Sequence, residues 1–258
     1  MSKGGRFCGL FLFPMTTTDA FIHPIRLKGE PELKGPCLFL VNPQEARYAV
    51  QGAKQNKAQS FPLFHSNLLT IPHGESSLVS WAGPAIGAPF AVMTLEKLIA
   101  LGISQCIVLG WCGSLLPSLQ IGDVVLPTWA ISEEGTSPHY PVNQSPQSSS
   151  RLRHSLRAHL EEKGISSAEG PVWTTDALYR ETGDKITRYA DQSILAVDME
   201  FSALATVSAF RGIDMAAVLL VSDELFHTEW KPGFHRKSLR KKSRRLFEIM
   251  TEFMPTLV

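Results

Sequence analysis

The sequence predicts an α/β protein in which a central, mostly parallel sheet has helices on both faces. Three features indicate this fold: short apolar runs of strand-forming residues, longer segments with apolar residues at i, i+3 and i+4, and the alternation of the two along 258 residues. No internal repeat interrupts the alternation. We therefore expect one domain over residues 1–258, with residues 1–20 as a loosely attached N-terminal extension.

Each element is predicted from its local pattern. The expected strands are largely apolar, as in strands buried on both faces, and cover residues 37–41 (CLFLV), 77–81 (SLVSW), 106–109 (CIVL), 123–126 (DVVL) and 215–221 (MAAVLLV). The expected helices carry apolar residues on one helical face and cover residues 89–101, 151–163, 200–210 and 234–253. Residues 138–150 are rich in Ser, Gln, Asn and Pro, which predicts a loop within this single domain.

The charge balance argues against a polyanionic partner. Lys and Arg number 25 and Asp and Glu 24, so no overall field would recruit nucleic acid or an anionic membrane. No stretch approaches the ~20 apolar residues of a membrane helix. Residues 236–245 hold seven basic residues, but an apolar stripe through the same segment predicts that they form the solvated face of the last helix. The alternative, nucleic-acid binding, would appear as salt-sensitive binding.

The cysteines indicate neither a disulfide framework nor a metal site. Cys8, Cys37, Cys106 and Cys112 form no CxxC pair, and no His pair has zinc-ligand spacing. We expect reduced thiols, no bound metal and a cytoplasmic location. The apolar run at residues 7–13 faintly resembles a signal peptide, but it is short and Pro14 ends it.

Residues that follow the expected strands are the candidates for a ligand site, because parallel sheets bind ligands at the carboxyl ends of their strands. These residues are Asn42 and Pro43, 82–89, 110–114, 174–179, 198–200, and Ser222 with Asp223. They combine glycines, hydroxyls and isolated carboxylates. None matches the spacing of a dinucleotide-binding or P-loop motif, so those two classes are excluded.

The same segments, in the same order, resemble the nucleoside phosphorylase superfamily, which holds purine nucleoside phosphorylases, uridine phosphorylases and related nucleosidases. The motifs are IGAP at 86–89, GWCGS at 110–114, IGDVV at 121–125, EGTS at 134–137, TTD at 174–176, VDME at 197–200 and VSD at 221–223. The resemblance implies a twisted α/β sheet, a homo-oligomer (dimer or hexamer) with active sites at subunit contacts, and pentosyl transfer from a small-molecule nucleoside. It implies no cofactor, with phosphate as the co-substrate of the phosphorylases.

The resemblance also assigns residues to the sugar. Glu200 matches the glutamate that accepts hydrogen bonds from the ribose 2′- and 3′-hydroxyls, and Met199 the residue that packs on the sugar. His23 aligns with the histidine that reaches the ribose 5′ position of the neighbouring subunit. The residue types alone allow another interpretation, in which Asp198 caps a helix and Glu200 is merely an acid of its first turn.

On the base side, Asp223 matches the aspartate that protonates purine N7, and its Ser-Asp context favours a purine over a pyrimidine. An apolar strand before it would raise its pKa toward that role. The resemblance places Cys112, Gly113, Leu178, Tyr179 and Ser222 around the base. The alternatives are that Asp223 caps a turn and that Leu178 and Tyr179 belong to the core.

The acceptor side departs from the family. Phosphorylases carry Gly-Asp-Pro-x-Arg in the first strand-to-helix turn, where residues 41–45 read VNPQE. The expected acceptor pocket includes Gly87, Val108 and Trp111. Val108 lies where the family has an arginine, and Trp111 lies where the family has a hydroxyl residue. Glu45 is close to the glutamate with which the nucleosidases of the superfamily activate water, although a solvated acid at a helix start is an equally simple interpretation. Phosphorolysis, hydrolysis and non-catalytic nucleoside binding therefore stay open; the last does not explain why both Glu200 and Asp223 are present.

Overall fold

The computed structural model describes residues 20–53, 58–73 and 77–258, so Cys8, the run at 7–13 and nearly all of the expected extension lie outside it. The strands are β1 (Pro36–Leu40), β2 (Gln59–Leu63), β3 (Ser66–His73), β4 (Ser77–Gly83), β5 (Gln105–Ser114), β6 (Val124–Glu133), β7 (Ser167–Thr175), β8 (Ala196–Asp198), β9 (Asp214–Glu224) and β10 (Lys231–Pro232). The helices are α1 (Pro43–Ala53), α2 (Ala88–Leu101), α3 (Ser150–Glu162), α4 (Gly183–Asp191), α5 (Phe201–Arg211) and α6 (Lys237–Phe253), with short 3₁₀ turns at Ser137–His139, Leu178–Arg180 and Met254–Leu257.

The strands form one mixed sheet in the order β10-β9-β6-β7-β8-β5-β1-β4-β3-β2. Strand β9 also pairs with β5, so β5, β9, β6, β7 and β8 close into a ring. The centre is parallel, since β1 runs parallel to β4 and β5, and β5 parallel to β9. The β5–β8, β6–β9, β2–β3 and β3–β4 pairs are antiparallel. The predicted α/β fold with a mixed central sheet is confirmed.

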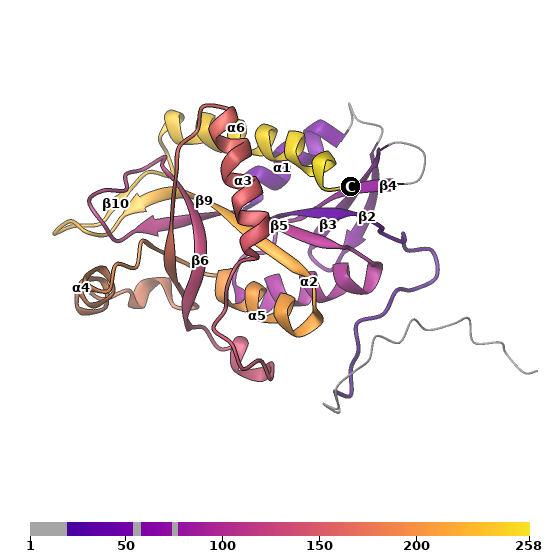
Figure 1. The fold of residues 1–258 in the computed structure, drawn as a ribbon, viewed down its shortest axis with the longest axis horizontal. Coiled ribbons are helices and arrows are strands. Elements are labelled where there is room, and N and C mark those ends of the chain that lie inside the picture. Colours follow the sequence, from indigo (N-terminus) through magenta and orange to yellow (C-terminus); the bar gives the residue numbers. More distant parts are fainter. Residues whose placement is uncertain (1–19, 54–57, 74–76) are drawn as a thin grey trace, which may run out of the picture.

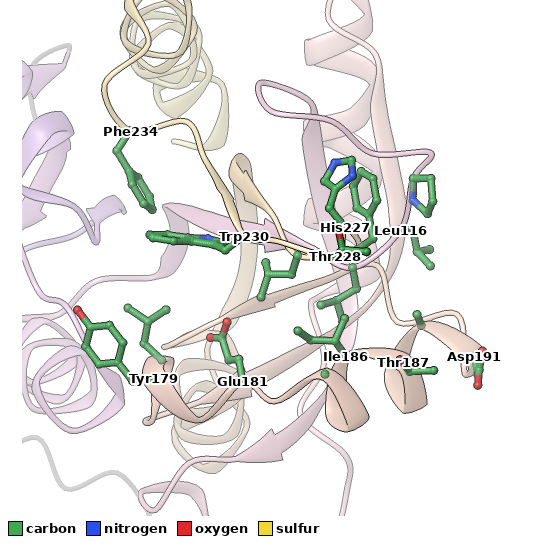
Figure 2. A pocket seen from close by; sticks show the side chains of 17 residues that line it. Leu116, Tyr179, Glu181, Ile186, Thr187, Asp191, His227, Thr228, Trp230 and Phe234 are labelled. Carbon is green, nitrogen blue, oxygen red and sulfur yellow. The ribbon is translucent and has the colours of Figure 1, made fainter.

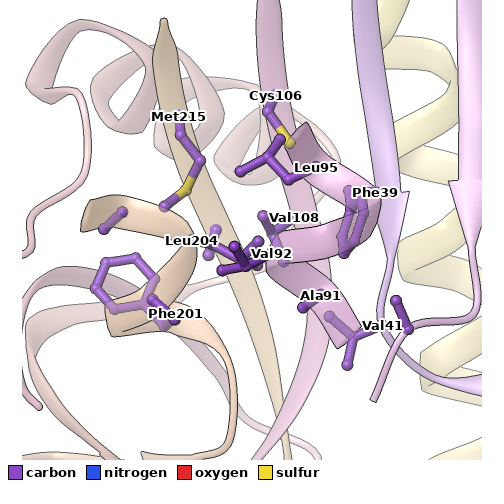
Figure 3. Close-up of a cluster of buried hydrophobic side chains, with 14 of the residues drawn as sticks. Phe39, Val41, Ala91, Val92, Leu95, Cys106, Val108, Phe201, Leu204 and Met215 are labelled. Atoms are coloured by element: carbon purple, nitrogen blue, oxygen red, sulfur yellow. The ribbon is translucent and has the colours of Figure 1, made fainter. Parts of the chain in front are cut away.

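Helices cover the sheet on both faces (Figure 1). Phe39, Cys106 and Val108 pack beneath α2 and α5 in one apolar cluster, which Figure 3 shows. The residues that alternate with them, such as Leu38 and Ile107, pack beneath α1, α3 and α6 on the opposite face. This two-sided burial explains why the strand sequences read as continuous apolar runs.

The helix boundaries have local causes. Helix α2 begins after Gly87, whose φ of 85° suits glycine, and has Pro89 in its first turn. It ends at Gly102, which adopts a left-handed conformation and donates to the carbonyls of Leu98 and Ile99. The Ser149 hydroxyl caps α3 by accepting from the Leu152 N–H.

The structure differs from the sequence prediction mainly at strand ends and in polar segments. Strands β5 and β9 run on to Ser114 and Glu224, so residues 110–114 and 222–223 lie on strands and not in the turns after them. Strands β2, β3, β7 and β8 and helices α1 and α4 were not predicted. Their sequences are short, polar or, in β7, interrupted by Gly170 and Pro171, so they carry weak apolar periodicity.

Candidate active site

Three strand ends meet at the candidate site. Strand β5 pairs with β8 and β9 near its carboxyl end, where Gly113 lies opposite both Val197 and Asp223. A register shift between Cys112 and Gly113 brings Gly113, and not its neighbour, opposite Asp223. The predicted base-side and sugar-side segments are thus brought side by side.

The Asp223 carboxyl is buried and bound by two side chains. The Ser222 hydroxyl donates to Oδ1 at 2.6 Å and the Trp230 indole Nε1 donates to Oδ2 at 2.8 Å. Burial raises the pKa of Asp223, while the two hydrogen bonds oppose the rise. Both donors are side chains, and no backbone N–H of the described residues donates to this carboxyl, so the alternative in which Asp223 caps a turn is wrong.

Gly113 is required by close packing at this point. A Cβ atom on Gly113 would lie 2.3 Å from Leu225 Cδ1 and 3.1 Å from Asp223 Oδ2. The Ser222 hydroxyl also donates to the Cys112 carbonyl at 3.2 Å, which fixes the strand end that carries Asp223. The Cys112 side chain itself is buried in the apolar cluster under α2 and α5.

Asp198 and Glu200 have separate roles. Asp198 Oδ2 accepts the backbone N–H groups of Glu200 (3.0 Å) and Phe201 (2.6 Å), and so binds the N-terminus of α5. The N-cap position itself is Glu200, so the alternative that made Glu200 an acid of the first turn is wrong. Glu200 instead reaches the start of α2, where its Oε1 accepts the Gly87 N–H at 2.5 Å. Burial and then the negative charge of Asp198 raise the pKa of Glu200 to about 8. Burial raises the pKa of Asp198 to about 6, and the charge of Glu134 adds to the rise. Met199, between them, is half-buried.

His23 lies on the exposed segment that precedes β1. It makes no hydrogen bond to any other described residue of its own chain. The segment is anchored to α2 by Lys97, which donates to the Ile25 carbonyl and pairs with Glu30, each at 2.6 Å. The geometry within one chain therefore does not join His23 to Glu200.

A cavity of about 770 Å³ opens beside Asp223 (Figure 2). Leu178 and Tyr179 line it and are 44% and 95% exposed, so the alternative that they are core residues is wrong. Three lining residues that the sequence patterns did not indicate are Glu181, Trp230 and Phe234. Burial and the negative charge of Asp223 raise the pKa of Glu181 to about 8.

Glu45 is a buried acid and not a solvated one. It lies in the first turn of α1, is 1% exposed, and its Oε1 accepts from Trp111 Nε1 (2.8 Å) and from the Ser243 hydroxyl of α6. Its Oε2 atom is buried without a partner, as is Asn42 Nδ2. Burial raises the pKa of Glu45 against these two hydrogen bonds.

The residues expected in one acceptor pocket have different neighbours. Val108 is in the apolar cluster under α2, whereas Trp111 packs on the opposite face of β5 against the α1–α6 cluster. Gly87 binds Glu200.

Trp111 stacks on Phe234 with ring centroids 6.1 Å apart, and the ring centroids of Phe234 and Trp230 are 5.8 Å apart. A chain of aromatic rings thereby links Glu45 to Asp223.

Within residues 20–53, 58–73 and 77–258, no group of three or more His, Cys, Asp and Glu side chains could hold a metal ion. No helix in this part of the chain is both long and apolar enough to cross a membrane. Cys37, Cys106 and Cys112 are buried free thiols.

The family model of the phosphorylase superfamily matches residues 38–255, so the chain belongs to that superfamily and the resemblance seen in the sequence is confirmed. DeoD-type purine nucleoside phosphorylases of Bacillus cereus (strain ZK / E33L) and Bacillus thuringiensis (strain Al Hakam) are each 31% identical over 156 residues, which span 58% of this chain and 66% of the relative.

Two solved structures share the fold. The purine nucleoside phosphorylase from Toxoplasma gondii, in complex with immucillin-H, has a TM-score of 0.77 at 22% identity and covers 94% of this chain and 98% of its own. The uridine phosphorylase from Vibrio fischeri ES114 has a TM-score of 0.74 at 20% identity, with 87% and 93% covered. At these identities the likeness concerns the fold.

Proposed function

We propose that the protein cleaves the N-glycosidic bond of a purine nucleoside. The observation that carries the proposal is the buried Asp223 carboxyl, whose pKa is raised and which binds Trp230, a residue that lines a ligand-sized cavity. A carboxyl group that keeps its proton near neutral pH is suited to protonate N7 of a departing purine. The purine phosphorylases among the relatives support the choice of base.

Glu200 would hold the sugar. Its Oε1 is oriented by the Gly87 N–H, and Glu200 follows β8, which pairs with β5 at Gly113. Hydrogen bonds from the ribose 2′- and 3′-hydroxyls to Glu200 would strengthen as positive charge develops on the ribose ring. The bond from C1′ to N9 then breaks, its electron pair moves onto the purine, and N7 receives the Asp223 proton.

We further propose that water is the acceptor, because of Glu45. A buried carboxyl with an unpartnered oxygen and a raised pKa is suited to take a proton from water as the water oxygen bonds to C1′. Phosphate is disfavoured, since no described cationic side chain hydrogen-bonds to Glu45, Gly87 or Trp111. A dianion beside an ionised, buried Glu45 would meet repulsion of several kcal/mol at low dielectric.

A homo-oligomer is part of the proposal. Phe21 and Ile22, which flank His23, are 100% and 84% exposed. Exposed apolar side chains on an extended arm suit a contact with a second copy, where His23 would reach a neighbour's ribose site. Light scattering after size-exclusion chromatography tests this, and a monomer at micromolar concentration would contradict it.

The deciding experiment follows base release from adenosine, inosine and uridine with and without phosphate, and identifies the sugar product. We expect free purine and ribose at a rate independent of phosphate. Release that needs phosphate and yields ribose 1-phosphate would overturn the choice of water but retain glycosidic cleavage. Binding of nucleosides without any release would indicate the non-catalytic alternative.

A further inference from the structure

The cavity beside Asp223 lies entirely on the base side of the site. Leu178 and Tyr179 line it, but Glu200, Met199 and Asp223 do not. Its volume of about 770 Å³ is in the range of a complete small-molecule site, which typically spans ~300–1,000 Å³. A purine base alone would leave most of it empty.

The cavity has two chemically different parts. The part next to Asp223 is formed by Tyr179, Glu181, Trp230 and Phe234, and Figure 2 shows the Glu181 carboxyl directed toward the Trp230 ring. The part farther along α4 is mostly apolar, with Leu115, Ile186, Ala190, Leu225 and Phe226 in its lining. Its polar lining residues are Thr187, Asp191, His227 and Thr228. An amphipathic ligand, polar near Asp223 and apolar beyond it, fits this order.

Glu181 is the polar group at the boundary between the two parts. Its carboxyl makes no hydrogen bond or ion pair with any other described side chain, although it is partly buried and feels the charge of Asp223. A partly buried carboxyl without a partner calls for a hydrogen-bond donor from a ligand. The two acids lie near each other, so they would meet neighbouring positions on the same edge of a base.

In adenine-type purines that edge presents N7 as an acceptor and the 6-amino group as a donor. With N7 at Asp223, the donor at position 6 would meet Glu181. An apolar group attached to the 6-amino nitrogen would leave one N–H for Glu181 and extend into the apolar part of the cavity.

We propose that this cavity is an extended base subsite for purine nucleosides with an apolar substituent on the 6-amino group, and that Glu181 accepts the remaining N–H. The inference rests on the proposed function, since it takes Asp223 as the group at N7. It adds the substrate class: 6-alkylamino or 6-arylmethylamino purine ribosides, in preference to unsubstituted adenosine.

The experiment compares kcat/KM for N6-benzyladenosine and adenosine. We expect the benzyl compound to be favoured at least tenfold, which corresponds to ~1.4 kcal/mol. Glu181→Leu removes the acceptor and Ala190→Phe fills the apolar part, so each should reduce the ratio toward one. Asp184→Asn is the matched control, because Asp184 is a carboxyl of α4 close to Glu181 in the sequence that does not line the cavity, and it should keep the wild-type ratio.

Calorimetry with the free bases separates this inference from the proposed function. If no nucleoside is cleaved, the proposed function fails, but N6-benzyladenine binding at least tenfold tighter than adenine would still support the extended subsite. Equal kcat/KM values, or equal base affinities where nothing is cleaved, would overturn it. A wild-type ratio in both Glu181→Leu and Ala190→Phe would overturn it as well.

Discussion

The indole Nε1 of Trp230 donates a hydrogen bond to Asp223 Oδ2 at 2.8 Å and so occupies the carboxyl group that we propose protonates the base. The other oxygen, Oδ1, accepts from Ser222. A purine whose N7 is to receive the Asp223 proton must therefore approach a carboxyl group that already binds these two donors. The segment that carries Trp230 follows β9 directly. The position of this segment therefore determines whether the indole binds Asp223, and this hydrogen bond lowers the pKa of Asp223.

Trp230→Phe should shift the pH dependence of base release. The indole hydrogen bond lowers the pKa of Asp223 by stabilising its charged form. Without it the pKa rises, the protonated acid persists to higher pH, and the alkaline limit of kcat/KM should move up by roughly 0.5–1 unit. Ser222→Ala removes the other donor and should shift the limit in the same direction. If the alkaline limit of kcat/KM stays the same or falls in both variants, Asp223 does not set the pH dependence of base release.

Asp223→Asn should abolish proton donation while it preserves the site's shape. The amide oxygen can still accept from Trp230, and the amide NH2 can donate to the Ser222 hydroxyl oxygen, so nucleoside binding should persist. Release of an ordinary purine should fall by about 10²–10⁴-fold. A nucleoside already methylated and positively charged at N7, such as 7-methylguanosine, needs no acid and should be cleaved at close to the wild-type rate. Equal losses for both substrates would contradict the general-acid role.

Glu45→Gln tests the proposed base. The amide oxygen can still accept from Trp111 and Ser243, so the free energy of unfolding should change by less than ~1 kcal/mol, whereas hydrolysis should fall at least ~10²-fold. Ser243→Ala is the companion variant, because its hydroxyl lowers the pKa of Glu45. Its loss should move the acidic limit of hydrolysis to higher pH. If Glu45→Gln kept full activity, Glu45 would not be the base, and its role would be structural.

The sequence predicted the elements with strong apolar periodicity and the residues that lie at strand ends. Asp223 and Gly113 do converge, because parallel strands β5 and β9 end at the same edge of the sheet. Their local environments could not be predicted. The Glu200 bond to Gly87 joins residues 113 positions apart, and such pairs are defined by tertiary packing.

The aromatic residues and Glu181 illustrate the same limit. Trp230 and Phe234 follow β9 in a polar segment that carries no motif, so nothing in the sequence places their rings between Asp223 and Trp111. Glu181 comes soon after Leu178 and Tyr179, which were predicted to lie around the base. This closeness in the sequence is the feature that could have indicated Glu181 as a site residue. The expected grouping of Val108 with Trp111 ignored the alternation of side chains along β5, which directs them to opposite faces.

Glu181→Gln should stabilise the protein at alkaline pH. The folded-state pKa of Glu181 is raised to about 8 from 4.5, so the folded protein holds this proton more tightly than the unfolded chain does. The resulting stability is fully present below pH ~4.5 and is lost as pH rises through about 8. Urea unfolding at pH 8.5 should show Glu181→Gln ~1–2 kcal/mol more stable than the wild type, a value reduced for solvent screening. Asp184→Asn should show no such gain.

Gly113→Ala should damage stability and catalysis together, because the new methyl group would meet Leu225 Cδ1 at 2.3 Å and Asp223 Oδ2 at 3.1 Å. Relief requires Leu225 to leave its packed position, which costs ~1–3 kcal/mol, and displaces the carboxyl that meets the base. Gly52→Ala in α1, away from the cavity, is the matched control, since its added Cβ would meet only Trp81 ring atoms at 3.6 and 3.8 Å, which is ordinary van der Waals contact. That variant should be neutral or stabilising by up to ~1 kcal/mol. Thermal unfolding and base release measured on both variants test this contrast; equal behaviour would mean that Leu225 and Asp223 adjust freely and that the close contact at Gly113 does not position the acid.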